Sequence, residues 1–240
     1  MRVNIMRHIQ KIIYSLVLLL LSHQTHASLI LKGTRIIYPG DKERISIQTV
    51  NDSEQASLIQ SWIDEGDIHS TPETTKAPFI VTPPVAKIAA NEGAQLRIQY
   101  IGEDLPQDRE SVFYLNVLDI SPKPQNKQGM NLIQLALQIR IKLFYRPTIL
   151  SGNIESVIDL VKLSSSDKQL IIENPTPYFL NISEVYYEKN QQNPIAKSVM
   201  VAPFSEQNIH ENNEYKQDIV VVFINDQGNL ISHKIKRASL

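Results

Sequence analysis

The feature that most constrains the fold is an uninterrupted alternation of apolar and polar residues over 132–145 (LIQLALQIRIKLFY). The odd positions from 133 to 143 are all large aliphatic residues: Ile133, Leu135, Leu137, Ile139, Ile141 and Leu143. The even positions include four polar residues: Gln134, Gln138, Arg140 and Lys142. Successive side chains of a strand point to opposite faces, so the pattern predicts one β-strand with an apolar face and a mostly polar face. Typical strands have about five or six residues, and this one is more than twice as long.

Short runs rich in β-branched and aromatic residues occupy the rest of the chain. Eight of them are prominent: 44–50, 57–63, 95–101, 112–120, 169–173, 180–188, 218–225 and 230–237. Clusters of Pro, Asn, Asp and Gly separate the runs, as in Thr82-Pro83-Pro84 and Asn225-Asp226-Gln227-Gly228. No run combines a period of 3.6 residues with helix caps. The chain is therefore predicted to be all-β, and the spacing of about seven short strands in its first half is typical of an immunoglobulin-like sandwich.

Two boundaries divide the chain. Basic residues precede a short apolar stretch at 12–21, and Thr25-His26-Ala27 follows it, which is the pattern of a cleavable signal peptide over 1–27. The apolar stretch has about half of the roughly 20 residues that a membrane span needs. Pro147 ends the long strand, because proline has no N–H for a ladder. We therefore expect an exported, soluble protein with β-domains at 28–147 and 148–240.

Charge and cysteine content exclude several classes of function. Removal of the signal peptide leaves 21 Lys and Arg residues against 25 Asp and Glu residues, so the balance favours neither nucleic acid nor a polybasic membrane anchor. The chain has no cysteine. An exported protein of this kind cannot use disulfides, thiol catalysis or thiolate metal sites, and an apolar core must stabilise each domain.

No pattern of catalytic residues is present. Three histidines remain after the signal peptide, at His69, His210 and His233, and their spacing matches no metal motif. Nucleophile-elbow and phosphate-binding glycine motifs are missing, and the acidic residues are scattered through turns. The sequence therefore predicts neither an enzyme nor a bound metal or cofactor.

Two segments carry a specific family resemblance: 105–116 (LPQDRESVFYLN) and 132–147 (LIQLALQIRIKLFYRP). Further motifs occur in the expected order along the chain: Thr34-Arg35, Gln60-Ser61-Trp62-Ile63, Thr82-Pro83-Pro84, 173–178 (ENPTPY) and Ile224-Asn225-Asp226. Together they resemble the periplasmic pilus-assembly chaperones, the PapD-like family. The resemblance implies two immunoglobulin-like domains set at an angle, with a cleft between them. It also implies a periplasmic protein that binds pilus subunits by donor-strand complementation and delivers them to an outer-membrane usher.

The resemblance assigns roles to five residues near the cleft. Ile133, Leu135 and Leu137 correspond to the family's alternating residues that enter an open groove in the subunit, whereas the pattern alone favours packing of these side chains in their own core. Arg35 and Lys142 correspond to the basic pair that holds the subunit's C-terminal carboxylate. Such an anchor sets the register of the paired strands, because a slip of one residue would turn every side chain to the other face.

Three charged residues correspond to the family's interdomain cluster: Glu110, Arg146 and Asp226. An arginine between two carboxylates would set the angle between the domains, and the alternative is that the three are unrelated surface charges. A long apolar edge strand also invites aggregation, so we expect a self-capping oligomer when no subunit is bound. The short connection between Ile120 and Asn131 resembles the chaperones of thicker, adhesin-tipped pili.

One other class of protein remains open. A fimbrial structural subunit or adhesin would also have an immunoglobulin-like fold. Such proteins usually carry a disulfide and end in an alternating strand with an aromatic residue near the terminus, whereas this chain ends in residues 234–240 (KIKRASL).

Overall fold

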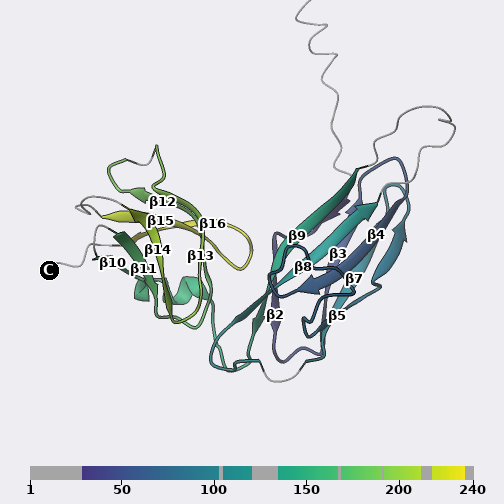
Figure 1. Cartoon of the computed structure of the whole chain (residues 1–240), viewed down its shortest axis with the longest axis horizontal. Coiled ribbons are helices and arrows are strands. Elements are labelled where there is room, and N and C mark those ends of the chain that lie inside the picture. The colour runs from purple at the N-terminus through teal and green to yellow at the C-terminus, as the bar shows by residue number, and fades with distance from the viewer. Residues whose placement is uncertain are drawn as a thin grey trace, which may run out of the picture.

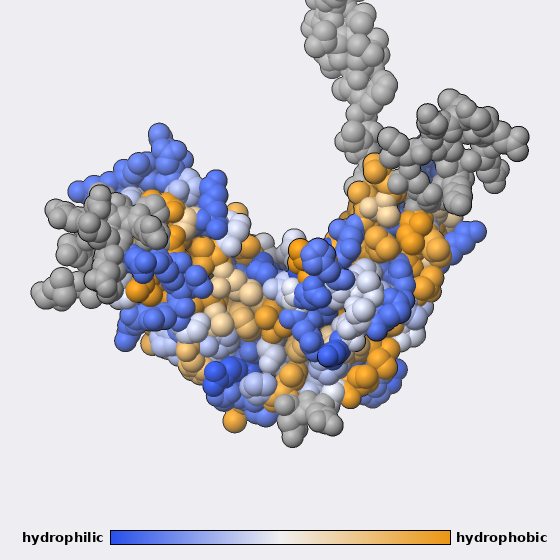
Figure 2. Space-filling view, in the orientation of Figure 1, coloured by the Kyte–Doolittle hydropathy of each residue, from blue (hydrophilic) through white to orange (hydrophobic). Residues whose placement is uncertain are grey.

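Two β-domains form the arms of a V (Figure 1), and the space-filling view shows a hollow between them (Figure 2). The computed structural model describes residues 29–102, 105–120, 135–166, 169–190, 192–211 and 218–235. The predicted signal peptide at 1–27 and the connection after Ile120 lie outside these residues. The prediction of an all-β fold with two sandwich domains is confirmed. In the described part of the chain, no helix is both long and apolar enough to cross a bilayer.

The first domain is a sandwich of two sheets. Its described strands are β1 (Leu29–Leu31), β2 (Arg35–Pro39), β3 (Arg44–Asn51), β4 (Ser57–Asp64), β5 (Phe79–Thr82), β6 (Val85–Ile88), β7 (Gly93–Tyr100), β8 (Ser111–Ile120) and β9 (Ala136–Arg146). One sheet has the order β1-β3-β7-β5, and the other has the order β2-β9-β8-β4-β6. The pairing of β2 with β9 is parallel, and the other pairings are antiparallel.

Alternating side chains of the two sheets form the core of the first domain. Leu96 and Ile98 of β7 point inward, as do Leu115 and Val117 of β8, and all four are fully buried. Aromatic rings fill the end nearest the second domain, where Tyr38 stacks on Tyr145 with ring centroids 5.9 Å apart. Burial of this apolar surface is the main favourable term in folding, and here it acts without disulfides.

The second domain is smaller and also has two sheets. Its elements are η1 (Ile154–Leu160), β10 (Lys162–Ser166), β11 (Gln169–Asn174), β12 (Leu180–Tyr187), β13 (Ala196–Val201), β14 (Ser205–Glu211), β15 (Ile219–Ile224) and β16 (Leu230–Ile235). The sheets have the orders β10-β11-β14 and β13-β12-β15-β16. The fully buried side chains between them include Ile172, Leu180, Ile219 and Phe223.

Sequence patterns missed one helix. The 3-10 helix η1 has Asn153 as its N-cap, whose side chain accepts a hydrogen bond from the backbone N–H of Ser156. Its buried residues are Ile154 and Ile158. Seven residues are too few for a 3.6-residue period to stand out, and Asn and Ser also favour turns, so the local signal resembled a loop.

The long strand β9 determines the geometry of the cleft. It ends at Arg146, next to Pro147, as predicted, and its described part begins at Ala136. Residues 136–145 pair with β8 on one side. On the other side, β2 pairs only with residues 142–146. Within the described ranges, no strand pairs with that second edge over residues 136–141, which leaves this edge of the sheet open.

Candidate functional site

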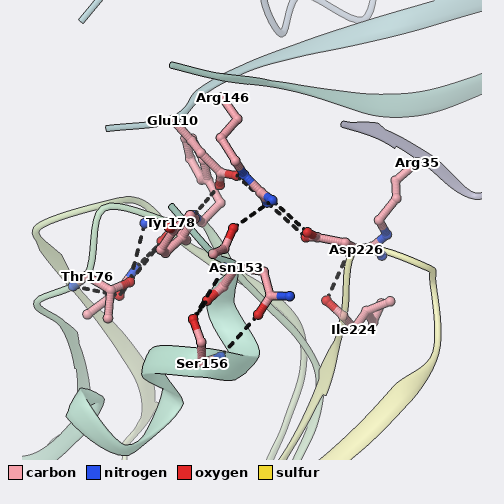
Figure 3. A network of polar contacts seen from close by, with 12 residues as sticks. Arg35, Glu110, Arg146, Asn153, Ser156, Thr176, Tyr178, Ile224 and Asp226 are labelled. Carbon is pink, nitrogen blue, oxygen red and sulfur yellow. Dashed lines mark hydrogen bonds and ion pairs between the residues drawn. The ribbon is translucent and has the colours of Figure 1, made fainter. Parts of the chain in front are cut away.

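A cluster of ionised side chains joins the two domains (Figure 3). Arg146, at the end of β9, donates from Nε to Oε1 of Glu110 at 2.8 Å. Its two terminal nitrogens donate to both carboxylate oxygens of Asp226 in the second domain, at 2.7 and 3.0 Å. The structure thus brings the three residues together in a fork-like geometry, which suits a planar guanidinium.

Further contacts make this cluster part of the domain junction. The Arg146 side chain is only 13% exposed and that of Glu110 only 3%. The second carboxylate oxygen of Glu110 accepts a hydrogen bond from the backbone N–H of Phe179 at 2.8 Å. Burial disfavours the charge on Arg146, but the hydrogen bonds and charges of Asp226 and Glu110 outweigh burial and raise its pKa. The cluster is therefore a nearly dry ion network that spans both domains.

Arg35 and Lys142 lie side by side next to this cluster. They are register partners in the parallel pairing of β2 with β9. Arg35 donates to the backbone carbonyl of Ile224 at 3.1 Å, and Lys142 donates from Nζ to Oδ1 of Asn181 at 2.7 Å. Both acceptors belong to the second domain, so the two cations lie at the junction of the domains, where Figure 3 shows Arg35 near Ile224 and Asp226.

The electrostatics of this pair favour a bound anion. Burial lowers the pKa of Lys142, and the neighbouring charge of Arg35 lowers it further. Burial also lowers the pKa of Arg35, which Asp226 partly opposes. The Nε atom of Arg35 is buried and has no hydrogen-bond partner among the described residues. A carboxylate would relieve the repulsion between the cations and accept hydrogen bonds from both.

The lining of the junction is partly aromatic. Phe144 of β9 and Phe179 of the second domain pack together with ring centroids 5.6 Å apart and ring planes tilted by 44°. Both rings line a small pocket with Arg35 and Asn181. The space-filling view shows the concave face between the domains, with hydrophilic and hydrophobic residues side by side along it (Figure 2). The apolar contacts hold the two domains close to the cation pair.

The apolar face of β9 changes its environment along the strand. Leu143 is fully buried, and Ile139 and Ile141 pack against the core of the first domain. Farther from the junction, Leu137 is 57% exposed and Leu135 is 70% exposed. Leu143 thus packs in the core of its own domain. Leu135 and Leu137, for which the alternating pattern alone favours such packing, do not. Ile133 lies outside the described residues.

Sequence reasoning missed Asn181 as part of this site. The residue is buried, although it begins an Asn-Ile-Ser tripeptide that reads as a surface sequon. No periodicity or spacing connects it with Lys142, which lies 39 positions earlier. The sequence indicates only that Asn181 lies in a strand shortly after the turn at Asn174-Pro175-Thr176-Pro177. The contact with Lys142 arises from the docking of the two domains.

The described residues contain no group of three or more His, Cys, Asp or Glu side chains that could hold a metal ion. His233 lies 3.6 Å from Asp159, which is exposed to solvent. The polar contacts described at the junction are ion pairs and hydrogen bonds, and the donors of Arg35 and Lys142 suit an anionic ligand.

Two family models and several known proteins match this chain. The family model for the N-terminal domain of the PapD pili and flagellar-assembly chaperones matches residues 28–151, and the model for the PapD C-terminal domain matches residues 156–235. The predicted boundary at Pro147 itself stays a prediction. Chaperone protein HifB of Haemophilus influenzae is 42% identical over 193 residues, which are 78% of each chain. The probable fimbrial chaperone YehC of Escherichia coli K12 is 38% identical over 224 residues, covering 93% of this chain and 91% of its own.

Solved structures give the same result. The CupB2 chaperone of Pseudomonas aeruginosa matches with a TM-score of 0.75 and 30% identity, over 87% of this chain and 100% of its own. The complex of the SafA pilin with the SafB chaperone of Salmonella enterica contains a chain that matches with a TM-score of 0.76 and 28% identity, over 90% of this chain and 99% of that one. The alternative of a fimbrial structural subunit is therefore set aside. The chain belongs to the PapD-like family of pilus-assembly chaperones, which are not enzymes, and it is a fimbrial chaperone.

Proposed function

We propose that this chaperone captures pilus subunits by pairing the open edge of β9 with an exposed groove of the subunit. One observation carries the proposal: the open edge at 136–141 begins beside the Arg35–Lys142 pair. An extended chain whose C-terminus lies at the two cations would continue directly along that edge. Ladder hydrogen bonds would supply affinity that depends little on the sequence of the partner.

The cation pair would hold the terminal carboxylate of the subunit. Each charge-assisted hydrogen bond contributes about 1.5–3 kcal/mol, and about 1.4 kcal/mol is a tenfold change in affinity. Because the carboxylate lies at Lys142 and the chain extends past Ala136, the subunit strand would run parallel to β9, in line with β2. Anchoring this end would set the register of the whole pairing.

The exposed leucines would supply the apolar part of the contact. We propose that Leu135 and Leu137, with Ile133, enter the groove of the subunit. Full burial of such an aliphatic side chain contributes about 1.5–3 kcal/mol. The large exposed fractions of Leu135 and Leu137 in the free chain support this role, since side chains that are already buried would have little more to gain.

The interdomain cluster has a supporting role in this proposal. Glu110, Arg146 and Asp226 would hold the domains at the angle at which Arg35 reaches Ile224 and Lys142 reaches Asn181. Removal of one partner from a buried ion network typically costs about 3–5 kcal/mol. The cluster would therefore preserve the shape of the site and would not contact the subunit.

Three further parts of the proposal concern the setting. Residues 1–27 would direct export to the periplasm, the loaded chaperone would deliver its subunit to the outer-membrane usher, and the free protein would cap its open edge by self-association. The exposed apolar edge supports the last of these. Sedimentation of the free protein should then show oligomers at higher protein concentration, and addition of the subunit should dissociate these oligomers. The relation to chaperones of thicker pili rests on the connection after Ile120 and stays a prediction.

Alanine substitution of the cations tests the proposed site. The variants Arg35→Ala and Lys142→Ala are coexpressed with a pilus subunit that the wild-type protein captures, and chaperone–subunit complexes are isolated from the periplasm. We expect each variant to retain about a tenth or less of the wild-type yield of complex, because each loses one charge-assisted contact. The melting temperature of the free protein reports on folding.

Lys87→Ala is the matched control, since Lys87 is an exposed cation on β6 at the opposite edge of the same sheet. It should leave the yield of complex unchanged. Wild-type yield with both Arg35→Ala and Lys142→Ala would contradict the carboxylate anchor.

A further inference from the structure

A second ion pair crosses three strands of the sheet that contains β9. Arg140 of β9 donates from its terminal nitrogen to Oδ1 of Asp64 at 2.6 Å and from Nε to Oδ2 at 3.2 Å. Asp64 is the last residue of β4, so the arginine side chain crosses the intervening strand β8. On the way, its guanidinium lies 3.9 Å from the ring centroid of Tyr114, in the geometry of a cation–π contact.

Asp64 is strongly held in its ionised form. Its side chain is only 2% exposed, compared with 22% for Arg140. Burial opposes ionisation, but hydrogen bonds from Arg140, from Asn116 at 2.6 Å and from the backbone N–H of Gly66 at 2.6 Å outweigh it and lower the pKa of Asp64. Arg140 is thus neutralised by a carboxylate that is itself satisfied on both oxygens.

The position of Arg140 makes its neutralisation relevant to the site. Arg140 and Lys142 are two residues apart on β9 and therefore point to the same face. Their Cα atoms are separated by about 6.8 Å, the rise of two strand residues. If Arg140 were free, β9 would present two cations to an incoming carboxylate, and either could serve as its anchor.

A second anchor would create a specific error. A subunit strand that slips by one residue turns its apolar side chains to the wrong face, so alternation alone excludes it. A slip by two residues keeps every side chain on its correct face. Alternation cannot exclude that slip, and only the position of the carboxylate anchor can.

We propose that Asp64 is a specificity-determining residue that sequesters Arg140 and so leaves Lys142 as the single carboxylate anchor on β9. Asp64 acts through Arg140 and does not contact the subunit. Tyr114 and Asn116 complete the enclosure, one by stacking on the guanidinium and the other by bonding to the Asp64 carboxylate. The inference rests on the function proposed above and adds to it the residue that prevents a two-residue register error.

The decisive experiment releases Arg140 when the normal anchor is missing. Asp64→Asn has the same shape as the native residue and removes the charge that neutralises Arg140. Lys142→Ala alone should lower the yield of periplasmic complex about tenfold. The double variant Asp64→Asn/Lys142→Ala should recover capture severalfold, because the freed arginine accepts the carboxylate. Adding Arg140→Gln should abolish that recovery.

Register is read directly by cross-linking. The chain has no cysteine, so Ala136→Cys provides a single reactive thiol. Ala136 is exposed and lies on the same face of β9 as Arg140 and Lys142. Single cysteines are placed at successive positions of the last strand of the subunit. With Asp64 intact, one position should cross-link, and Asp64→Asn should add a second position two residues away. If Asp64 had a purely structural role, Asp64→Asn would lower the melting temperature and would not add a second cross-linked position.

The double variant Asp64→Asn/Arg140→Gln, called the neutral pair, tests whether misfolding accounts for the effects of Asp64→Asn. It keeps Lys142 and removes both charges, so it should capture subunits at the wild-type level and in one register. No recovery in Asp64→Asn/Lys142→Ala, or loss of capture by the neutral pair at an unchanged melting temperature, would overturn the proposal. Normal capture by Lys142→Ala alone would instead overturn the carboxylate anchor, and the present inference with it.

Discussion

Asn181 is the residue of the second domain that contacts Lys142. Its Oδ1 atom accepts the hydrogen bond from Lys142 at 2.7 Å, while Arg35 on the neighbouring strand bonds to the backbone of Ile224. A neutral amide can orient the ammonium group without neutralising it. The charge of Lys142 therefore stays available to an anionic partner, which a carboxylate at position 181 would prevent.

Asn181→Asp should therefore weaken capture of the subunit. The new carboxylate would form an internal ion pair with Lys142 and repel the terminal carboxylate of the subunit, so we expect about a tenfold rise in the dissociation constant. The measurement is binding of a synthetic peptide with the C-terminal sequence of the subunit, by calorimetry. The same peptide with an amidated C-terminus is the control, and it should bind both proteins equally weakly. Equal affinity of the two proteins for the free-acid peptide would show that Asn181 has no part in the anchor.

At the level of elements, β9 carries two functions on one apolar face. The part near the junction, including Leu143, is core, and β2 protects its second edge. The first part of β9 has an open edge, and Leu137 and the preceding Leu135 are exposed there. The short length of β2 produces this division. Its five residues pair with 142–146 of β9 and leave the preceding residues of β9 without a partner strand on that side.

Leu137→Glu should abolish capture while the fold is kept. The side chain is more than half exposed in the free chain, so the carboxylate can remain hydrated there, whereas in an apolar groove it would be desolvated without a partner. We expect at least a tenfold loss of complex and a melting temperature within about 2 °C of wild type, as for other surface substitutions. The matched control is Leu230→Glu, at a similarly exposed leucine on β16 of the second domain. Undiminished capture by Leu137→Glu would show that this side chain does not enter the groove of the subunit.

For the whole molecule, a few polar contacts determine how the two arms meet. Arg146 bonds to one carboxylate from each domain, and the backbone N–H of Glu110 donates to the carbonyl of Pro177 at 2.9 Å. A second arginine, Arg109, lies 4.9 Å from the ring centroid of Phe204 in the second domain. Ion pairs are directional, so this junction favours one interdomain angle over a range of angles.

Arg146→Met should loosen the angle between the domains. It leaves Glu110 and Asp226 close together without their shared cation, at an expected cost of about 3–5 kcal/mol in the stability of the junction. Small-angle scattering should show a broader distribution of distances between the domains, and capture of the subunit should fall. Lys197→Met is the control, because it breaks an exposed pair with Glu184 within the second domain, which is worth at most about 1 kcal/mol. An unchanged scattering profile for Arg146→Met would mean that apolar contacts alone set the angle.

The sequence alone determined the strands whose signals are local. Alternation located most of β3, β4, β7, β8 and β9, and Pro147 marked the end of β9, because side-chain direction and the missing proline N–H act over neighbouring residues. Short elements such as β1, β6 and η1 have too few residues to show a period, and they were missed. The family motifs singled out Arg35, Lys142 and the three charged residues of the junction, although no local pattern connects them.

Only the tertiary structure decided what these residues contact. Arg146 meets Asp226 across 80 positions, Arg140 meets Asp64 across 76, and Lys142 meets Asn181 across 39. Contacts of this kind depend on strand order and on the docking of two domains, which periodicity does not encode. The fate of the apolar face of β9 is equally non-local. Leu137 and Leu143 look alike in the alternating pattern, and the length of β2 and the end of the sandwich decide that Leu143 is buried while Leu137 stays exposed.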